Sequence, residues 1–241
     1  MKAMILAAGL GTRLRPLTDD RPKALVTVAG KTLLEITIQR LRAFGVNEII
    51  VNTHHFAEKI EEFLRAHQNF GIRIELSREE ELLDTGGGLK KAAWFFRGDD
   101  EPFLLHNVDV LSTIDLGAMV KAHRDSKAIV TLATMDRQTS RYLLFDEAGL
   151  LCGRRAGLEG KPELARHATE THALAFCGIH VISPRLLSHL IEDGVFSIIP
   201  AYLRLAAEGE KIATFRADAY AWRDLGKLEN LAEAERATSR F

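Results

Sequence analysis

The chain has 241 residues, enough for one large domain or two small ones. Its 32 basic and 33 acidic residues give a formal net charge of −1, which excludes a general nucleic-acid binder and a protein held on anionic membranes by its overall charge. No apolar run approaches the ~20 residues of a membrane span, and we do not expect Met1–Ala8 to be a signal peptide, because its apolar core is short and glycines follow at once. We therefore expect a cytoplasmic protein without a membrane or nucleic-acid partner, in which Cys152 and Cys177 are buried thiols.

Five apolar runs rich in β-branched residues predict buried strands in the first half of the chain, at residues 3–8, 48–53, 72–77, 102–107 and 128–134. Amphipathic segments between them predict helices at residues 32–45, 56–67 and 116–125. Thr32 and Glu35 have the spacing of a capping box, and Gly45 marks the end of the first helix. This alternation predicts parallel βαβ units in a doubly wound α/β sheet, which binds ligands at one edge.

The second half has a less regular pattern. It predicts a hairpin turning at residues 147–149, a polar loop at 154–172, a strand at 173–183, a helix starting at Ser183–Pro184, a helix at 200–210, a strand at 211–217 and a helix from Lys227. We expect one domain, residues 1–241, in which a sheet part (1–134) continues without a linker into a lobe (135–241) that covers the substrate.

The loop after the first predicted strand combines glycines with cations. Gly9 and Gly11 let backbone amides approach a ligand, and free amides in a row make an anion-binding nest. Arg13, Arg15 and Lys23 add positive charge. Together they predict a polyphosphate site.

Other phosphate-binding motifs fail on spacing. A dinucleotide fingerprint needs a third glycine where the chain has Leu14, and a P-loop needs a Gly-Lys-Ser/Thr triplet that the sequence lacks. A plain glycine turn with surface arginines is the remaining alternative.

The segment "LAAGLGTRLRPLTDDRPKALVTVAGKTLLE" resembles the N-terminal motif of the sugar-1-phosphate nucleotidyltransferases, also called nucleoside-diphosphate-sugar pyrophosphorylases. That motif is L-A-A-G-x-G-T-R-L-x-P-L-T followed by P-K, and Thr32 stands where the family usually has proline. The resemblance implies a doubly wound, Rossmann-like, predominantly parallel mixed sheet flanked by helices. It also implies that residues 1–134 bind the nucleotide and residues 135–241 bind the sugar.

The resemblance assigns roles within the opening loop. Arg13 would hold the phosphates that leave as pyrophosphate, and Lys23 the phosphates at the reacting centre. The nucleotide would be contacted, largely through the backbone, by Ala8, Gly9, Gly11 and Thr12.

Two aspartates follow predicted strands and are candidate Mg²⁺ ligands, because nucleotidyl transfer needs a cation and Mg²⁺ prefers carboxylate and phosphate oxygens. Asp109 and Asp224 resemble the aspartates of the family's N-x-D and W-x-D-x-G elements. An aspartate at a strand end is more often a turn or a helix cap. Val108 and Lys227 depart from the family pattern beside these ligands.

No general base is expected, because a phosphate monoester is mostly dianionic at neutral pH (second pKa ~6). His54 and His55 are expected to be polar loop residues. His106 adjoins the site and is assigned no chemistry.

The stretch "LDTGGGL" places three glycines before a predicted helix, which by itself indicates a flexible helix entry or a phosphate site. It resembles the base-binding loop of N-acetylmuramate-1-phosphate uridylyltransferases and of short guanylyltransferases. That resemblance makes Gly87 and Gly88 candidate base contacts, with Asp84 and Thr85 as further candidates.

The sugar side departs most from the family. Many members carry Glu-Lys-Pro, whereas this chain has "EGKP", so Lys161 or Arg154 is the candidate cation, with a solvated charged loop as the alternative. Asn107 and Gly178 are the other candidate sugar contacts.

The resemblance implies Mg²⁺-dependent transfer from an NTP to a sugar-1-phosphate by a monomer or small homo-oligomer. UTP with N-acetylmuramate-1-phosphate or a related hexose phosphate is favoured over GTP with mannose- or heptose-1-phosphate and over CTP with phosphocholine. A non-catalytic nucleotide-sugar sensor on the same fold is the alternative outside the enzymes.

Overall fold

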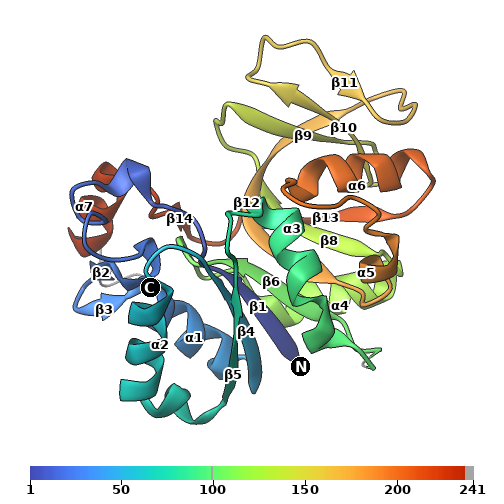
Figure 1. Cartoon of the computed structure of the whole chain (residues 1–241). Coiled ribbons are helices and arrows are strands. Elements are labelled where there is room, and N and C mark those ends of the chain that lie inside the picture. Colours follow the sequence, from blue (N-terminus) through green and yellow to red (C-terminus); the bar gives the residue numbers. More distant parts are fainter. Residues whose placement is uncertain (99, 237–241) are drawn as a thin grey trace.

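The structure is a computed structural model that describes residues 1–98 and 100–236 (Figure 1). Within these residues a ten-stranded sheet runs in the order β11-β10-β9-β12-β6-β1-β4-β5, with β8 paired to β12 and β13 paired to β8. Its strands are β1 (Lys2–Leu6), β4 (Glu48–Thr53), β5 (Arg73–Arg78), β6 (Phe103–Asn107), β8 (Val130–Met135), β9 (Arg141–Phe145), β10 (Leu151–Ala156), β11 (Glu163–Leu164), β12 (His172–Ile182) and β13 (Ile212–Arg216). Two short ribbons stand outside it, β2 (Thr27–Val28) with β3 (Lys31–Thr32) and β7 (Val110–Ser112) with β14 (Trp222–Asp224).

The sheet is mixed, with a parallel part built from the first half of the chain. Strand β1 lies between β4 and β6 and is parallel to both, and β5 is parallel to β4. Strand β12 then runs antiparallel to β6, β8 and β9. The predicted doubly wound α/β fold is confirmed, and all five predicted strands of the first half are present within two residues of their expected bounds.

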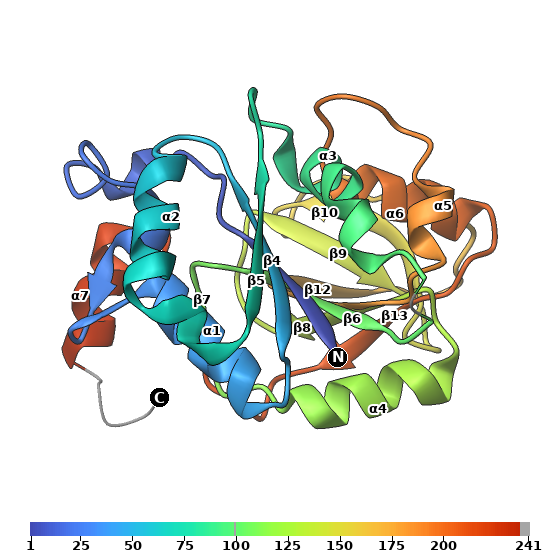
Figure 2. The same ribbon diagram turned by 60° about the horizontal axis from the view of Figure 1, so that its bottom comes forward.

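Helices cover both faces of the sheet. They are α1 (Leu33–Ala43), α2 (Ala57–Ala66), α3 (Asp84–Lys91), α4 (Leu116–Ser126), α5 (Leu186–His189), α6 (Ile198–Ala207) and α7 (Leu228–Arg236), with 3-10 turns at Thr12–Leu14, Lys23–Leu25, Gln68–Gly71 and Ala92–Phe96. Side chains of α1, α2, α4 and α7 enter one apolar core, and those of α3, α5 and α6 enter a second. In Figure 2, α4 runs along one side of the sheet, and α3, α5 and α6 lie on the other.

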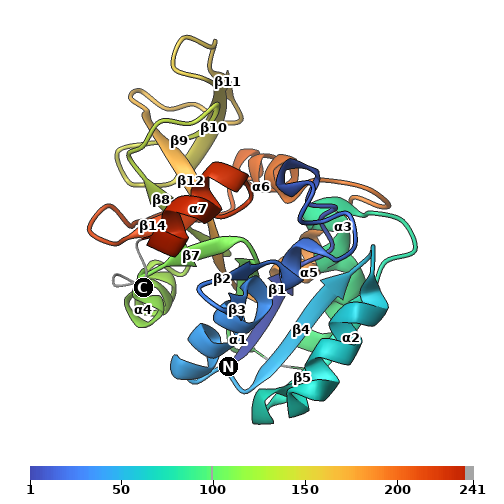
Figure 3. The ribbon, with the colours of Figure 1, turned by 90° about the vertical axis from the view of Figure 1, so that its left-hand side faces the viewer.

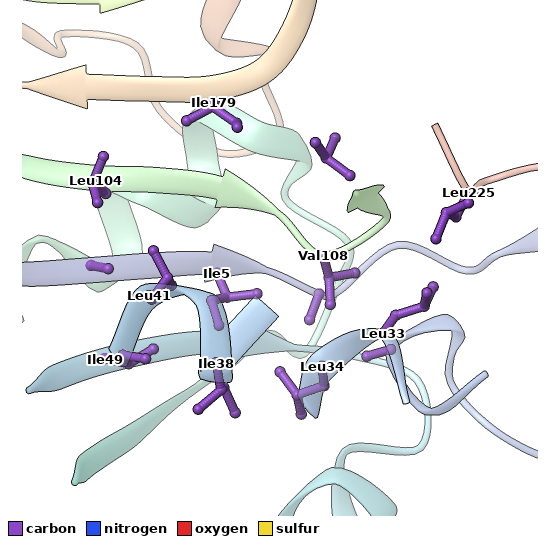
Figure 4. Packing of buried hydrophobic residues seen from close by; sticks show 14 of the residues in the cluster. Ile5, Leu33, Leu34, Ile38, Leu41, Ile49, Leu104, Val108, Ile179 and Leu225 are labelled. Carbon is purple, nitrogen blue, oxygen red and sulfur yellow. The ribbon is translucent and has the colours of Figure 1, made fainter. Parts of the chain in front are cut away.

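The first core shows why the α1 segment is helical and where it binds. Leu34, Ile38 and Leu41 recur at helical spacing and are fully buried against the strands. Figure 4 shows them beside Ile5 and Ile49 of the neighbouring strands. Each such side chain contributes about 1.5–3 kcal/mol when removed from water, so this stripe fixes α1 on the sheet.

The predicted start and end of α1 are confirmed, although its capping box is only half formed. The Thr32 hydroxyl accepts a hydrogen bond from the Glu35 amide at 3.0 Å, whereas the Glu35 carboxylate accepts from Gln39 Nε2 at 2.9 Å instead of reaching back. Gly45 ends the segment at φ +96°, a conformation that glycine adopts without steric cost.

Three predictions for the second half need correction. The predicted loop 154–172 contains the end of β10 and the short β11, because residues 153 and 154 pair with this strand. Ser183 does not cap a helix, since its hydroxyl donates to the Ala128 carbonyl and α5 begins at Leu186. The helix predicted at 200–210 spans Ile198–Ala207, and the last part of the predicted C-terminal helix lies outside the described residues. Across residues 1–98 and 100–236, no helix is both long and apolar enough to cross a membrane.

Candidate active site

Two aspartates that are 115 residues apart in the chain meet beside the end of β6. Asp109 lies in the turn from β6 to β7, and β7 pairs antiparallel with β14, which places Asp224 opposite Val110. The Leu225 amide donates to the Asp109 carbonyl at 2.7 Å, so the backbone on both sides is locked in this register. The pairing therefore sets the two carboxylates next to each other.

The two predicted cations approach these carboxylates. Lys23 Nζ is 2.6 Å from Asp109 Oδ2, and both side chains are largely buried. Arg13 Nη2 is 3.9 Å from Asp224 Oδ2, and the Arg13 side chain is 57% exposed, so its guanidinium is accessible to a ligand. The site thus has an inner, shielded ion pair and an outer, open cation.

Gly226 marks the meeting point of these groups. A Cβ added there would lie 2.7 Å from Arg13 Nη2 and 2.8 Å from both Asp109 Oδ2 and Asp224 Oδ1. The Gly226 amide also donates to Asp224 Oδ1 at 2.7 Å. Only a residue without a side chain leaves room for the charged groups to converge here.

The opening loop folds tightly over Lys23. Gly11 has φ +66°, and a Cβ at this position would come within 2.9 Å of the Thr18 methyl and 3.0 Å of the Lys23 Cβ. The Thr18 hydroxyl donates to the Gly11 carbonyl at 2.9 Å. By contrast, a Cβ at Gly9 would meet nothing within 4 Å, so Gly9 borders open space. Ala8 and Thr12 flank these two glycines on the same loop.

A buried polar bridge that the sequence analysis missed links this loop to α3. Asn52, at the end of β4, accepts from the Ala7 amide at 2.7 Å and donates to Glu79 Oε1 at 2.8 Å. The other carboxylate oxygen, Glu79 Oε2, accepts from the Leu83 amide at 3.0 Å. Both bridging residues are at most 5% exposed. The only sequence signal was a polar residue near the end of one strand, Asn52 in β4, and another directly after β5, Glu79.

The three glycines lie inside α3, not before it, because α3 begins at Asp84. Their lack of side chains lets the helix pack against the segment 194–196: a Cβ at Gly87 would lie 2.4 Å from the Gly194 carbonyl oxygen, and one at Gly88 would lie 2.7 Å from Glu79 Oε1. The Gly87 amide donates to the Phe196 carbonyl at 3.2 Å. Close packing is therefore a sufficient reason for the glycines, and a base contact at Gly87 has to compete with Phe196 for this amide.

The two other candidates on α3 already have partners in the protein. The Thr85 hydroxyl accepts from the Ile198 amide at 3.0 Å and caps α6. Asp84 Oδ1 accepts from the Thr85 amide at 2.6 Å. These bonds give both residues a local structural role.

On the sugar side the structure separates the four candidates into two pairs. Gly178 lies against Asn107, since a Cβ there would be 2.9 Å from Asn107 Nδ2, and Asn107 ends β6 next to the Asp109 turn. Arg154 pairs with Glu163 at 2.7 Å on the β10–β11 hairpin, and Lys161 lies in the exposed turn of that hairpin. Figures 1 and 3 both show this hairpin at one edge of the sheet, whose other edge is β5.

A second group that sequence reasoning missed adjoins Gly178. The Arg137 guanidinium lies over the Trp222 ring, with Cζ 3.9 Å from the ring centroid. Arg137 Nη2 donates to the Phe176 carbonyl and Trp222 Nε1 to the Cys177 carbonyl, both at 2.8 Å. We call Arg137 and Trp222 the Arg–Trp stack.

A profile of the nucleotidyl transferase family matches residues 2–240. The chain belongs to this family. It is 38% identical to N-acetylmuramate alpha-1-phosphate uridylyltransferase of Caulobacter vibrioides over 212 residues, which cover 86% of this chain and 85% of that protein. It is 42% identical to mannose-1-phosphate guanyltransferase of Gibberella zeae over 146 residues, 59% of this chain and 40% of that protein. The sugar-1-phosphate nucleotidyltransferase family predicted from the opening segment is therefore confirmed.

The crystal structure of HddC from Yersinia pseudotuberculosis complexed with GMP-PN shares the fold. The TM-score is 0.77 at 21% identity, and the match covers 98% of this chain and 99% of that one. The predicted nucleotide-diphospho-sugar transferase fold is therefore confirmed.

The donor set of this nucleotidyltransferase suits a hard cation bound jointly with phosphates. Two carboxylates, Asp109 and Asp224, converge at Gly226, while no group of three or more His, Cys, Asp or Glu side chains that could hold a metal ion occurs among the described residues. Mg²⁺ is commonly bound by one or two carboxylates plus substrate phosphates, so the two aspartates fit it.

His54, His106 and the two cysteines of the nucleotidyltransferase contact other protein groups. His54 Nδ1 bonds the Glu79 carbonyl at 3.0 Å. His106 is fully buried, and burial, together with the charge of Arg40, lowers its pKa to about 3, so its imidazole is neutral. Cys152 and Cys177 are buried, as predicted, and burial raises the pKa of both thiols, that of Cys177 to about 12.

Proposed function

We propose that this nucleotidyltransferase transfers a nucleoside monophosphate, preferably from UTP, to a sugar-1-phosphate and releases pyrophosphate, with Mg²⁺ as its metal. Family members act on an NTP and a sugar phosphate and generally use a divalent metal ion. The observation that carries the proposal is the convergence of two cations and two carboxylates around one glycine, namely Arg13, Lys23, Asp109, Asp224 and Gly226.

The reaction needs positioning and charge neutralisation more than covalent help. A phosphate oxygen of the sugar-1-phosphate, already deprotonated at neutral pH, bonds to the α-phosphorus in line with the α–β bridging oxygen. The bond to that oxygen breaks, and its electron pair leaves with pyrophosphate.

Each charged side chain has a place in this step. Arg13, exposed on the opening loop, neutralises charge on the leaving phosphates. Lys23, shielded beside Asp109, neutralises charge at the α-phosphate. Asp109 and Asp224 would hold Mg²⁺, which spreads the phosphate charge when bound.

On this proposal the chain divides its work along the sequence. Residues 1–134 supply the opening loop, α3 with Gly87 and Gly88, and Asp109. Residues 135–241 supply Gly178 and Asp224 for the sugar phosphate and the metal. Arg154 and Lys161 are not needed in this scheme, because they lie on the β10–β11 hairpin at the edge of the sheet, where Arg154 pairs with Glu163.

The preference for UTP and N-acetylmuramate-1-phosphate rests on the Caulobacter vibrioides relative, which is matched over 85% of its length. GTP with mannose-1-phosphate is the second candidate, because the guanyltransferase of Gibberella zeae is 42% identical over the region it shares. That region covers only 40% of that protein, which is why we rank it second.

The decisive experiment measures pyrophosphate release with Mg²⁺ over a grid of UTP, GTP, CTP, dTTP and ATP against sugar-1-phosphates and phosphocholine. We expect strong release with UTP and N-acetylmuramate-1-phosphate and none without Mg²⁺. Strong release in another cell would replace the substrate assignment. Binding of an NTP without release in any cell would contradict the proposed enzyme and favour a nucleotide-sugar sensor.

A further inference from the structure

Strand β12 carries a bulge at the position where it passes the site. Its pairing with β8 runs from Ala175 opposite Met135 to Phe176 opposite Thr134, and resumes only with His180 opposite Leu132. Gly178 lies inside the interruption at φ +74°. The bulge turns backbone groups of residues 176–178 away from β8.

Two carbonyls released by the bulge are recovered by one side-chain unit. Buried carbonyls are almost always hydrogen-bonded, so a bulge of this kind is retained only with replacement donors. The Arg–Trp stack supplies both: Arg137 bonds the Phe176 carbonyl, and Trp222 bonds the Cys177 carbonyl. The guanidinium lies directly on the indole ring, so neither donor moves without the other.

The Arg–Trp stack joins the two-stranded ribbon of β7 and β14 to the main sheet. Trp222 is the first residue of β14 and Asp224 the last, and in the part of the chain that the structure describes, β14 pairs with β7 alone. A two-stranded ribbon of this length has little stability of its own. The Leu225 amide bonds the Asp109 carbonyl and Asn230 Nδ2 bonds the Asp224 carbonyl, which holds β14 locally, while Trp222 ties this ribbon to β12.

The same stack fixes the sugar side. Gly178 follows the two residues whose carbonyls are bonded, and it lies against Asn107 and Val110. Val110 in turn is the β7 residue opposite Asp224. The Arg–Trp stack therefore positions both Gly178, which lies against Asn107, and the carboxylate of Asp224.

Beyond the stack, Arg137 has one further hydrogen bond, from Nη1 to the carbonyl of the neighbouring Gln138 at 3.4 Å. Among the described residues it forms no ion pair with a carboxylate, and its Nε is buried without a hydrogen-bond partner. Because Nε is shielded, Nη2 is bonded to the Phe176 carbonyl and Nη1 to the Gln138 carbonyl, the guanidinium is held by protein groups.

We propose that Arg137 is a positioning residue: by holding Trp222 on the β12 bulge, it sets Asp224 for the metal and Gly178 for the sugar phosphate, without affecting the NTP side. This inference rests on the proposed function. It predicts a selective defect, because Arg13, Lys23 and α3 belong to other elements, and the contact of Arg13 with Asp224 is a long one, 3.9 Å, with the Arg13 side chain 57% exposed.

The test compares Arg137→Met, which keeps an apolar chain over the indole but removes the donors, with Arg137→Lys, which keeps a cation and one donor. The matched control is Arg166→Met, since Arg166 is also a partly buried arginine that donates to backbone carbonyls, but on the outer hairpin. For each variant the KM of both substrates, the Mg²⁺ concentration at half-maximal rate and the melting temperature are measured. Mn²⁺ binding in the presence of UTP, followed by electron paramagnetic resonance of the free ion, gives a readout that does not depend on turnover.

For Arg137→Met we expect the KM of the sugar phosphate, the Mg²⁺ requirement and the Mn²⁺ dissociation constant to rise about tenfold, while the KM of the NTP stays within about twofold. Arg137→Lys should recover part of each change, and Arg166→Met should show none of them. Equal changes on the NTP side, unchanged metal and acceptor constants, or the same pattern in Arg166→Met would overturn the inference. If Arg137→Met does not fold, Arg137→Lys and Trp222→Phe decide by the same criteria.

Failure of this inference is distinguishable from failure of the proposed function. A wild-type protein that is inactive over the whole substrate grid contradicts the proposed function, and the Mn²⁺ measurement still tests the positioning role of Arg137. An active wild-type protein with an unaffected Arg137→Met variant contradicts the positioning role alone.

Discussion

The carboxylate of Asp109 has two neighbours that give it different tasks. Lys23 Nζ lies 2.6 Å from Asp109 Oδ2. A Cβ added at Gly226 would lie 2.8 Å from the same oxygen. In this environment the negative charge matters more than the shape of the side chain. It holds Lys23 in place and, in the proposed reaction, binds the metal.

We predict that Asp109→Asn lowers the rate of pyrophosphate release by at least about 100-fold, because the amide keeps the volume but loses the charge. The fold should persist, with a melting temperature close to that of the wild type. Steady-state kinetics and a thermal melt followed by circular dichroism measure the two effects.

The control is Asp115→Asn, the same chemical change at the N-cap of α4. Asp115 Oδ1 accepts from the Ala118 amide at 2.9 Å, and asparagine caps helices equally well. This variant should retain full activity. Near-normal turnover of Asp109→Asn would contradict the metal assignment.

At the scale of the elements, the nucleotide side is held together by the bridge of Asn52 and Glu79. It joins the first loop, the end of β4 and the start of α3 through three hydrogen bonds in a buried setting. The two loops that are proposed to bind phosphate and base are therefore fixed relative to each other by side chains that need not touch the nucleotide.

We predict that Glu79→Ala destabilises the protein by about 2–3 kcal/mol, because Asn52 Nδ2 and the Leu83 amide lose their acceptors in a buried place. We also expect a higher KM for the NTP than for the sugar phosphate. Urea unfolding and steady-state kinetics check both. Glu80→Ala, at the exposed neighbouring position, is the control and should change neither; equal unfolding free energies for the two variants would contradict the role of the bridge.

Local sequence patterns were sufficient to predict most helices and strands, but not the contacts that join them. Strands β1, β4, β5, β6 and β8 follow from apolar runs, and helix α1 follows from apolar periodicity and from Thr32 and Gly45, which act within a few residues. The two aspartates that converge at Gly226 were predicted only through their resemblance to family motifs. The bridge of Asn52 with Glu79 was missed because polar residues at strand ends have many uses, and only the fold brings these two together.

The Arg–Trp stack and the glycines of α3 were missed or misplaced for a related reason. The stack depends on a change of register in β12, which no local pattern encodes. The glycines suggested a helix entry because glycine disfavours helices, yet tight packing against residues 194–196 overrides that preference.

At the scale of the whole molecule, three buried histidines are built into the sheet and the elements packed on it. His106 in β6, His180 in β12 and His123 in α4 are each at most 2% exposed. Burial lowers the pKa of His106 and His180 to about 3 and that of His123 to about 4, from an ordinary value of 6.5. All three are therefore neutral in the folded protein across the acidic range in which they would be protonated in the unfolded chain.

This difference in histidine pKa between the folded and unfolded states predicts that the protein loses stability at pH values above those at which most carboxylates become protonated. Below pH 6.5 the unfolded state binds protons that the folded state does not, so the free energy of unfolding is fully present above pH 6.5 and falls as the pH decreases toward 4. Each histidine contributes a slope of up to about 1.4 kcal/mol per pH unit, and the three together about 4. Urea unfolding at several values between pH 7 and pH 4.5 measures this slope.

The double variant His180→Phe, Tyr202→Phe isolates one of the three contributions. His180 Nδ1 and the Tyr202 hydroxyl are hydrogen-bonded to each other at 3.0 Å. Replacing both residues removes the bond without leaving one of its two polar groups buried and unpaired. We expect the slope below pH 6.5 to fall by about one third, because one of three proton-linked groups is gone. His167→Gln, at an exposed position, is the control and should leave the slope unchanged. An unchanged slope in the double variant would mean that His180 takes up its proton without unfolding, and that the packing around β12 yields locally before the whole sheet does.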